Sequence, residues 1–247
     1  MEQLLNLLEK VNDDSVKGQA FNVFKEIATK LMSEYAIKKG GDLYQMVEIE
    51  FYWYSPNHPD LSVYPRKSAA GNWFLHPSGV DITLESCVNE DISMLQLRKE
   101  WENAKKDQEN QNVVYSKSSY GGILIRTLRK FKKGDSEGKD SFIVGPWNCS
   151  DILFDYLPCD GNEAELKKMI PVIEPIKPNE MMKNNLSTDF VKEALRSGIE
   201  KQHTVKYHDK PYCFYVNKEY VKGWADGSFP NKPWNKRAQD LKLYNNV

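Results

Sequence analysis

The segment from Val47 to Tyr54 constrains the fold of this chain more than any other part of the sequence. It reads Val-Glu-Ile-Glu-Phe-Tyr-Trp-Tyr and is followed by Ser-Pro-Asn, a pattern typical of a β-strand that ends at a turn. Side chains alternate between the two faces of a strand, so Glu48, Glu50 and Tyr52 share one face and the apolar residues share the other. The acidic face has two interpretations. It holds a general base beside aromatic walls, or it is the solvated side of a half-exposed strand.

Composition limits the class of protein. The chain has 247 residues, of which 40% are hydrophobic and 28% charged, enough for one domain with a sizeable core. It contains no apolar run near the roughly 20 residues that a membrane helix needs, and its first residues lack the basic start of a signal peptide. We therefore expect a cytoplasmic protein with no membrane association and with reduced thiols. The four histidines lack metal-ligand spacing, so we expect no metal and no cofactor.

The charge pattern bears on nucleic acid as a partner. A net charge of -1 weighs against strong electrostatic binding of DNA, which usually requires a basic domain. A local basic patch can serve instead, and one cluster falls within eight positions of the chain. We expect this cluster to contact phosphate. The alternative is that it forms only a solvated turn. The members of the cluster are Arg126, Arg129, Lys130, Lys132 and Lys133.

Hydrophobic periodicity and turn residues predict one α+β domain over residues 1–247. We expect helices within residues 1–35, with Ser15 as the cap of the second helix. The last residues, 223–247, are expected to form an irregular tail. A surface insertion is expected at 89–115. Strands are expected at 44–54, 120–131 and 212–216, a hairpin at 73–84, and short helices at 151–157 and 188–195.

Seven segments occur in an order that resembles the alkyladenine (methylpurine, or 3-methyladenine) DNA glycosylase family. That family has a helix ending in paired leucines, a Val-Glu-Thr-Glu-Ala-Tyr strand, a Gly-x-x-Tyr-Val-Tyr hairpin, a Val-Leu-Ile-Arg-Ala strand, a Gly-Pro turn, an Arg-Val-Gly-Ile segment and a Lys-Pro-x-Arg-Phe-Tyr-Val strand. The corresponding segments here are 27–32, 47–52, 71–76, 121–126, 145–146, 195–199 and 210–216. The resemblance implies a curved, mostly antiparallel sheet with helices packed around it, in a divergent member of the family.

The resemblance also implies a function in DNA base excision repair. Such an enzyme binds double-stranded DNA, flips a damaged base into a pocket and hydrolyses its N-glycosidic bond. Glu50 matches the catalytic carboxylate that activates water, and Tyr52 matches a residue that stacks on the base. Arg126 matches an arginine near the active site, where it pairs with Glu50, meets a phosphate or serves as a structural strand-end residue. The other expected residues of the base pocket are His58, Trp73, Leu75 and His76.

Some positions depart from the family pattern. The stacking aromatic falls at Leu75, the tyrosine that wedges into the duplex falls near Ser78, and the asparagine that guards the pocket falls at Glu85. These departures keep a second hypothesis open. In that hypothesis the chain is a catalytically inactive or repurposed module that binds a ligand or partner in the same cleft.

Overall fold

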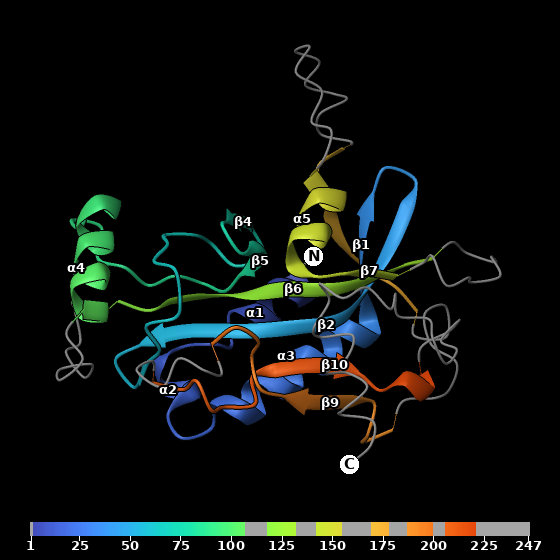
Figure 1. The fold of residues 1–247 in the computed structure, drawn as a ribbon, viewed down its shortest axis with the longest axis horizontal. Helices are drawn as coiled ribbons and strands as arrows, with labels where there is room; N and C mark the ends of the chain where they lie inside the picture. The colour runs from blue at the N-terminus through green and yellow to red at the C-terminus, as the bar shows by residue number, and fades with distance from the viewer. Residues whose placement is uncertain are drawn as a thin grey trace, which may run out of the picture.

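The structure is a computed structural model of the chain. It describes residues 2–106, 118–131, 142–154, 169–177, 187–199 and 206–220. Within them the fold is α+β, with helices at the start of the chain and a curled antiparallel sheet after them (Figure 1).

Three helices begin the fold: α1 (Glu2–Leu8), α2 (Asp13–Val16) and α3 (Ala20–Glu34). The expectation that Ser15 caps the second helix is wrong. The side chain of Asn12 accepts a hydrogen bond from the Ser15 backbone N–H, and Ser15 Oγ accepts one from the Asn12 N–H, so Asn12 is the cap of α2. Gly18 then takes a positive φ of 71°, which ends α2 and separates it from α3.

Ten strands form one sheet among the described residues. Its main order is β4-β5-β6-β2-β1-β8; β3 and β10 also pair with β2, β7 with β6 and β9 with β10, each pair antiparallel. The strands are β1 (Tyr35–Lys39), β2 (Asp42–Ser55), β3 (His58–Pro59), β4 (Trp73–His76), β5 (Gly79–Thr83), β6 (Tyr120–Phe131), β7 (Phe142–Val144), β8 (Val172–Pro175), β9 (Val191–Ala194) and β10 (Cys213–Val216). The remaining elements are α4 (Met94–Lys106), α5 (Pro146–Phe154) and the 3-10 helix η2 (Lys218–Tyr220).

The two longest strands, β2 and β6, run side by side through the middle of the molecule (Figure 1). Helix α3 packs against β2, and Phe24 of α3 stacks on Phe51 of β2 with ring centres 4.7 Å apart. The alternation expected for β2 is confirmed on this apolar face. The solvated interpretation of the opposite face is wrong, since Glu48 and Glu50 are both buried there. Other parts of the sheet and its loops cover this side.

The register between β2 and β6 is irregular at one step. Met46 lies opposite Leu128 and Ile49 opposite Ile125, but between them Glu48 lies opposite Thr127. On both sides of this step the register is otherwise the same. Bulges of this kind redirect side chains and are common beside functional sites.

Several local expectations are confirmed or corrected by the structure. The hairpin expected at 73–84 is formed by β4 and β5, and the strand expected at 120–131 is β6. The helix expected at 188–195 is wrong: residues 191–194 form β9, because pairing with β10 outweighs local helical spacing. Helix α5 begins earlier than expected, at Pro146, a residue well suited to a first helical position.

The described residues include no helix that is both long and apolar enough to cross a membrane. The insertion at 89–115 is described only up to residue 106, where it contains α4. The tail at 223–247 lies outside the described residues.

Candidate active site

A pocket of about 230 Å³ opens on the polar face of β2. Loops, the β4–β5 hairpin, strands β2 and β6 and the N-terminal end of α5 contribute to it, together with a turn at 197–199. One part of its wall is formed by Tyr52, Leu124, Arg126, Pro146 and the turn from Ser197 to Ile199, and the other by Ser62, Tyr64, Arg66, His76, Ser78, Asp81 and Lys105.

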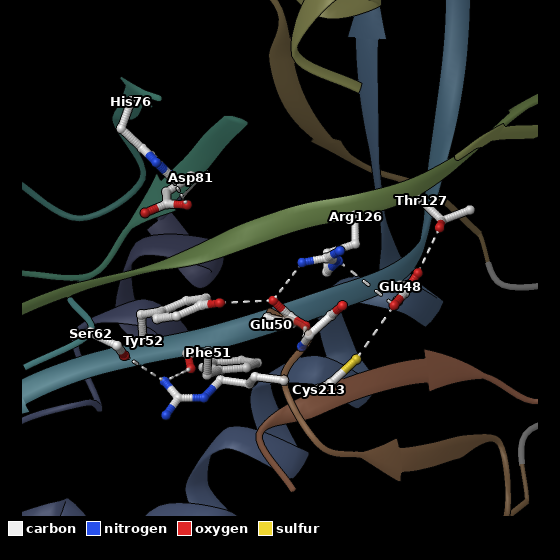
Figure 2. A network of polar contacts seen from close by, with 12 residues as sticks. Glu48, Glu50, Phe51, Tyr52, Ser62, His76, Asp81, Arg126, Thr127 and Cys213 are labelled. Carbon is white, nitrogen blue, oxygen red and sulfur yellow. Dashed lines mark hydrogen bonds and ion pairs between the residues drawn. The ribbon is translucent and has the colours of Figure 1, made fainter. Parts of the chain in front are cut away.

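Glu50 lies directly behind the first part of this wall and is fully buried. Its Oε2 accepts hydrogen bonds of 2.9 Å from both Tyr52 Oη and Arg126 Nη1 (Figure 2). Its Oε1 accepts a 2.7 Å hydrogen bond from the backbone N–H of Ser197. All three donors belong to residues that line the pocket, so the carboxylate is held in one orientation against it.

The hydroxyl of Tyr52 stays protonated in this site. Burial, reinforced by the neighbouring Glu50 carboxylate, raises the pKa of Tyr52 well above its usual value. A protonated hydroxyl donates to Glu50 and leaves the aromatic ring of Tyr52 as part of the pocket wall.

Arg196 packs against the ring of Tyr52 and precedes the residue whose backbone N–H meets Glu50. Its guanidinium is fully buried, lies 4.7 Å from the centre of the Tyr52 ring and donates a 2.6 Å hydrogen bond to Asp60 Oδ2. It also donates to the backbone oxygens of Phe51 and Tyr207. Since Ser197 is the next residue, this anchoring fixes the backbone N–H that meets Glu50.

The second part of the wall contains a buried charge pair. Asp81 Oδ2 accepts a 2.6 Å hydrogen bond from Arg66 Nη1, and Asp81 Oδ1 lies 3.0 Å from His76 Nε2. Burial of Asp81 opposes its ionisation, but Arg66 and His76 outweigh this and hold the pKa of the carboxyl below its usual value. The Arg66 guanidinium also lies 3.9 Å from the centre of the Phe74 ring. Asp81 is therefore an ionised carboxylate beside an imidazole at the pocket.

Glu48 forms a second set of polar contacts on the same face of β2, joined to that of Glu50 through Arg126. Its Oε2 accepts a 2.8 Å hydrogen bond from Thr127 Oγ1, and its Oε1 lies 3.6 Å from Cys213 Sγ (Figure 2). Glu48 does not line the pocket. Glu48 Oε1 also lies 3.9 Å from Arg126 Nε, so the two buried carboxylates share that arginine, but only Glu50 meets Tyr52 and the Ser197 N–H.

The structure gathers four of the expected site residues and separates three others. Tyr52, His76 and Arg126 line the pocket and Glu50 lies behind it. The other three lie elsewhere: His58 is buried against the ring of Tyr207 and bonded to the backbone oxygen of Trp53, Trp73 donates to the backbone oxygen of Pro171, and Leu75 points into solvent with 55% of its surface exposed.

The expected basic cluster is also divided. Arg129 is fully buried and donates to Gln45 Oε1, so a phosphate-contacting role for Arg129 is wrong. Lys130 pairs with Asp42 near the far end of β6 and does not line the pocket. Lys132 and Lys133 lie outside the described residues. Of the family departures, Ser78 lines the pocket, whereas Glu85 is exposed and accepts a hydrogen bond from the Ala70 backbone N–H.

Sequence reasoning missed Asp60, Arg66, Asp81 and Arg196. A signal for Asp81 was present, since an acidic residue between Val80 and Ile82 in a predicted strand is the same pattern that singled out Glu50. Arg66 and Asp60 lie in a loop, where no periodicity indicates which way a side chain points.

Comparison with known proteins adds no relative to this picture. No protein-family model matches the chain, and no curated protein matches it either. The function must therefore be argued from the geometry of the pocket.

Proposed function

We propose that this protein is a hydrolase of N-glycosidic bonds that removes a damaged, alkylated purine from DNA. The observation that carries the proposal is the position of Glu50, a buried carboxylate fixed behind an aromatic pocket by Arg126, Tyr52 and the Ser197 N–H. The pocket has a volume of about 230 Å³, which is below the roughly 300–1,000 Å³ of pockets for drug-sized ligands. That size suits a single base that has been turned out of a stack.

The chemistry assigned to the site follows from these contacts. The base enters against the ring of Tyr52, and its sugar carbon C1′ faces Glu50. Glu50 takes a proton from water as the water attacks C1′ and the bond to the base breaks. Arg126 pairs with Glu50 at 2.9 Å and holds the carboxylate oxygens in place. The positive charge that develops on the sugar ring is stabilised by the carboxylate.

Of the three cationic side chains that line the pocket, Arg66 is paired with Asp81 and Arg126 with Glu50. Lys105 is therefore the group that would meet a phosphate beside the flipped nucleotide. Because the net charge of the whole chain is -1, we expect electrostatic attraction to DNA to be limited to the surroundings of the pocket. We therefore expect weak binding to undamaged duplex that decreases strongly with salt.

A second candidate function is a module that binds a purine-like ligand without hydrolysis. Complete burial of Glu50 favours it, because a carboxylate with three donors is also the arrangement of a satisfied structural acid. In this case Glu50 holds β2, β6 and the turn at 197–199 together.

Release of a base from DNA distinguishes the two functions. Duplex oligonucleotides that contain one alkylated, deaminated or undamaged purine are incubated with the protein, and abasic sites are revealed by alkaline cleavage; free nucleosides are tested in parallel. We expect base release by the wild type and its loss on the order of a hundredfold to ten-thousandfold in Glu50→Gln. Glu48→Gln, which removes the other buried carboxylate beside Arg126, should lower release far less than Glu50→Gln, because Glu48 does not line the pocket.

Two outcomes contradict the hydrolase. If the wild type binds a purine ligand but releases no base from any DNA or nucleoside, the binding module is the better description. If Glu50→Gln folds and releases base at the wild-type rate in single turnovers, Glu50 is not the general base.

A further inference from the structure

Lys105 differs from the two arginines of the pocket in its partners. Arg66 is held by Asp81 and Arg126 by Glu50, whereas no carboxylate in the described part of the chain forms an ion pair with Lys105. Among the described residues, the amine of Lys105 is therefore not held in place by a buried charge.

Helix α4 brings Lys105 to the pocket. The helix stands at the end of the molecule where β2 ends (Figure 1), and Trp101 anchors it there by donating a 3.0 Å hydrogen bond from Nε1 to the backbone oxygen of Leu61. Lys105 follows Trp101 by four residues and lies on the same face of the helix. Its Nζ is 4.5 Å from the centre of the Trp101 ring. Ser62, the residue after Leu61, lines the pocket together with Lys105.

The surroundings of this amine suit a lysine that loses its proton. Part of the Lys105 side chain is exposed, yet burial lowers the pKa of its amine below the usual value, and the Asp60 carboxylate opposes this without reversing it. The Trp101 ring attracts the ammonium and positions the side chain before the proton leaves. A lysine that is partly withdrawn from water is a nucleophile toward carbonyl carbons, with which it forms imines.

We infer that Lys105 forms an imine with the abasic sugar left by base release and then cuts the DNA strand, an inference that rests on the proposed function. A phosphate of the flipped nucleotide and its carbon C1′ belong to the same nucleotide, so an amine that meets the phosphate is near C1′ once the base has left. In the open form of the abasic sugar, C1′ is an aldehyde, the kind of carbonyl that lysine attacks.

The steps of this lyase reaction balance without an oxidant or a reductant. The neutral amine of Lys105 adds to the aldehyde carbon C1′, and loss of one water gives a protonated imine. Water takes a proton from C2′, and the electron pair of that bond forms a double bond between C2′ and C3′. The bond from C3′ to its phosphate breaks, and its electron pair leaves with the phosphate. A second water hydrolyses the imine, which restores Lys105 and releases an unsaturated aldehyde on the cut strand.

The test uses duplex DNA with a preformed abasic site, so it does not depend on base release by this protein. A uracil in one strand is removed by a separate enzyme, and the protein is added with sodium borohydride, which reduces an imine to a stable amine. We expect the wild type to become linked to the DNA on a denaturing gel. Without borohydride, we expect it to cut the strand in the absence of alkali.

Two matched variants assign the reaction to one amine. Lys105→Arg keeps the positive charge but supplies no neutral amine, so it should lose both the trapped adduct and the strand cleavage. Lys106→Arg, the same substitution at the next residue, lies outside the pocket and should keep both. Thermal unfolding of Lys105→Arg checks that the variant is folded.

An absent adduct in the wild type, or an adduct in Lys105→Arg at the wild-type yield, overturns the assignment of Lys105. Base release from an alkylated duplex is measured on the same preparation. If that release occurs without an adduct on abasic DNA, the role of Lys105 fails and the proposed function stands. If the Lys105-dependent adduct forms but no base is released from any DNA, the proposed function fails and the lyase reaction stands.

Discussion

The backbone N–H of Ser197 donates a 2.7 Å hydrogen bond to Oε1 of Glu50, across 147 positions of the chain. The contact uses no side-chain atom of Ser197, so the sequence identity of that residue carries little information about it. It depends on the path of the backbone through the turn at 197–199, which Arg196 anchors to Asp60. A buried carboxylate that loses such a donor is destabilised, and this makes the contact testable.

We expect Ser197→Pro to destabilise the protein by about 1–3 kcal/mol, the typical penalty for leaving a buried polar group without a partner. Proline removes the N–H that meets Glu50, whereas Ser197→Ala keeps it and removes only the hydroxyl. Urea unfolding of both variants measures the difference. Equal stabilities for the two would mean that this hydrogen bond contributes nothing to the folded state.

Replacement of Arg196 tests how much the buried ion pair between Arg196 and Asp60 stabilises the protein. Arg196→Met leaves Asp60 buried without its cation, and breaking a buried pair in this way typically costs about 3–5 kcal/mol. The exposed pair between Lys25 and Glu193 is the control, because loss of a surface ion pair costs about 0–1 kcal/mol. The two free energies of unfolding should therefore differ clearly. A loss in Arg196→Met no larger than in Lys25→Met would count against a structural role for the buried pair.

His58 should make the stability of the protein depend on pH. Burial lowers the pKa of His58 in the folded state below the value of about 6.5 for an unfolded histidine. The stabilisation by neutral His58 is complete above that pH and is lost as the pH falls towards the folded pKa, with a slope of at most about 1.4 kcal/mol per pH unit.

Urea unfolding between pH 8 and pH 5 measures this slope, and NMR titration of the histidine ring protons assigns it. His58→Gln should flatten the decline, while His208→Gln should not. An identical slope in wild type and His58→Gln would show that another group is responsible.

Gly122 leaves space for the charge pair at the pocket. A Cβ at this position would lie 2.5 Å from Arg66 Nη1 and 2.8 Å from Asp81 Oδ2, and both groups are buried and paired. We expect Gly122→Ala to destabilise the protein by about 1–3 kcal/mol, as overpacking typically does. Gly41→Ala in the β1–β2 turn is the matched control, since a Cβ there would meet nothing within 4 Å. Thermal unfolding compares them; a Gly122→Ala variant as stable as the control would mean that the ion pair can shift without cost.

The sequence predicted five of the ten described strands and the faces of the longest one. Alternation and turn residues identified β2, the β4–β5 hairpin, β6 and β10 because these patterns are local. Local patterns failed for β9, where pairing with β10 decides the structure of residues 191–194. They also failed to show that the acidic face of β2 is covered, since its burial depends on segments distant in the chain.

For the site, the sequence identified Glu50, Tyr52 and Arg126 but missed Asp81 on β5 and the partners that lie in loops. The strand pattern placed Glu50 and Tyr52 on one face, and the family resemblance singled out Arg126. Asp60, Arg66 and the Ser197 N–H belong to connections between strands, so their directions are set only by the folded chain. Arg129 was misplaced because positive charge in a sequence does not distinguish a surface contact from a buried bond to Gln45.

The irregular step between β2 and β6 also limits how this protein can change by insertion and deletion. The ladder has the same register on both sides of Glu48, so the step is a local adjustment that does not move the rest of either strand. Loss of a single codon from β2 before Glu50, with the start of the strand held in its register, would exchange the two faces of the strand from that point onward. Glu50 would then turn toward the core and an apolar neighbour toward the pocket. A change in the length of β2 before Glu50 would therefore remove the site even if every remaining side chain of the strand were kept.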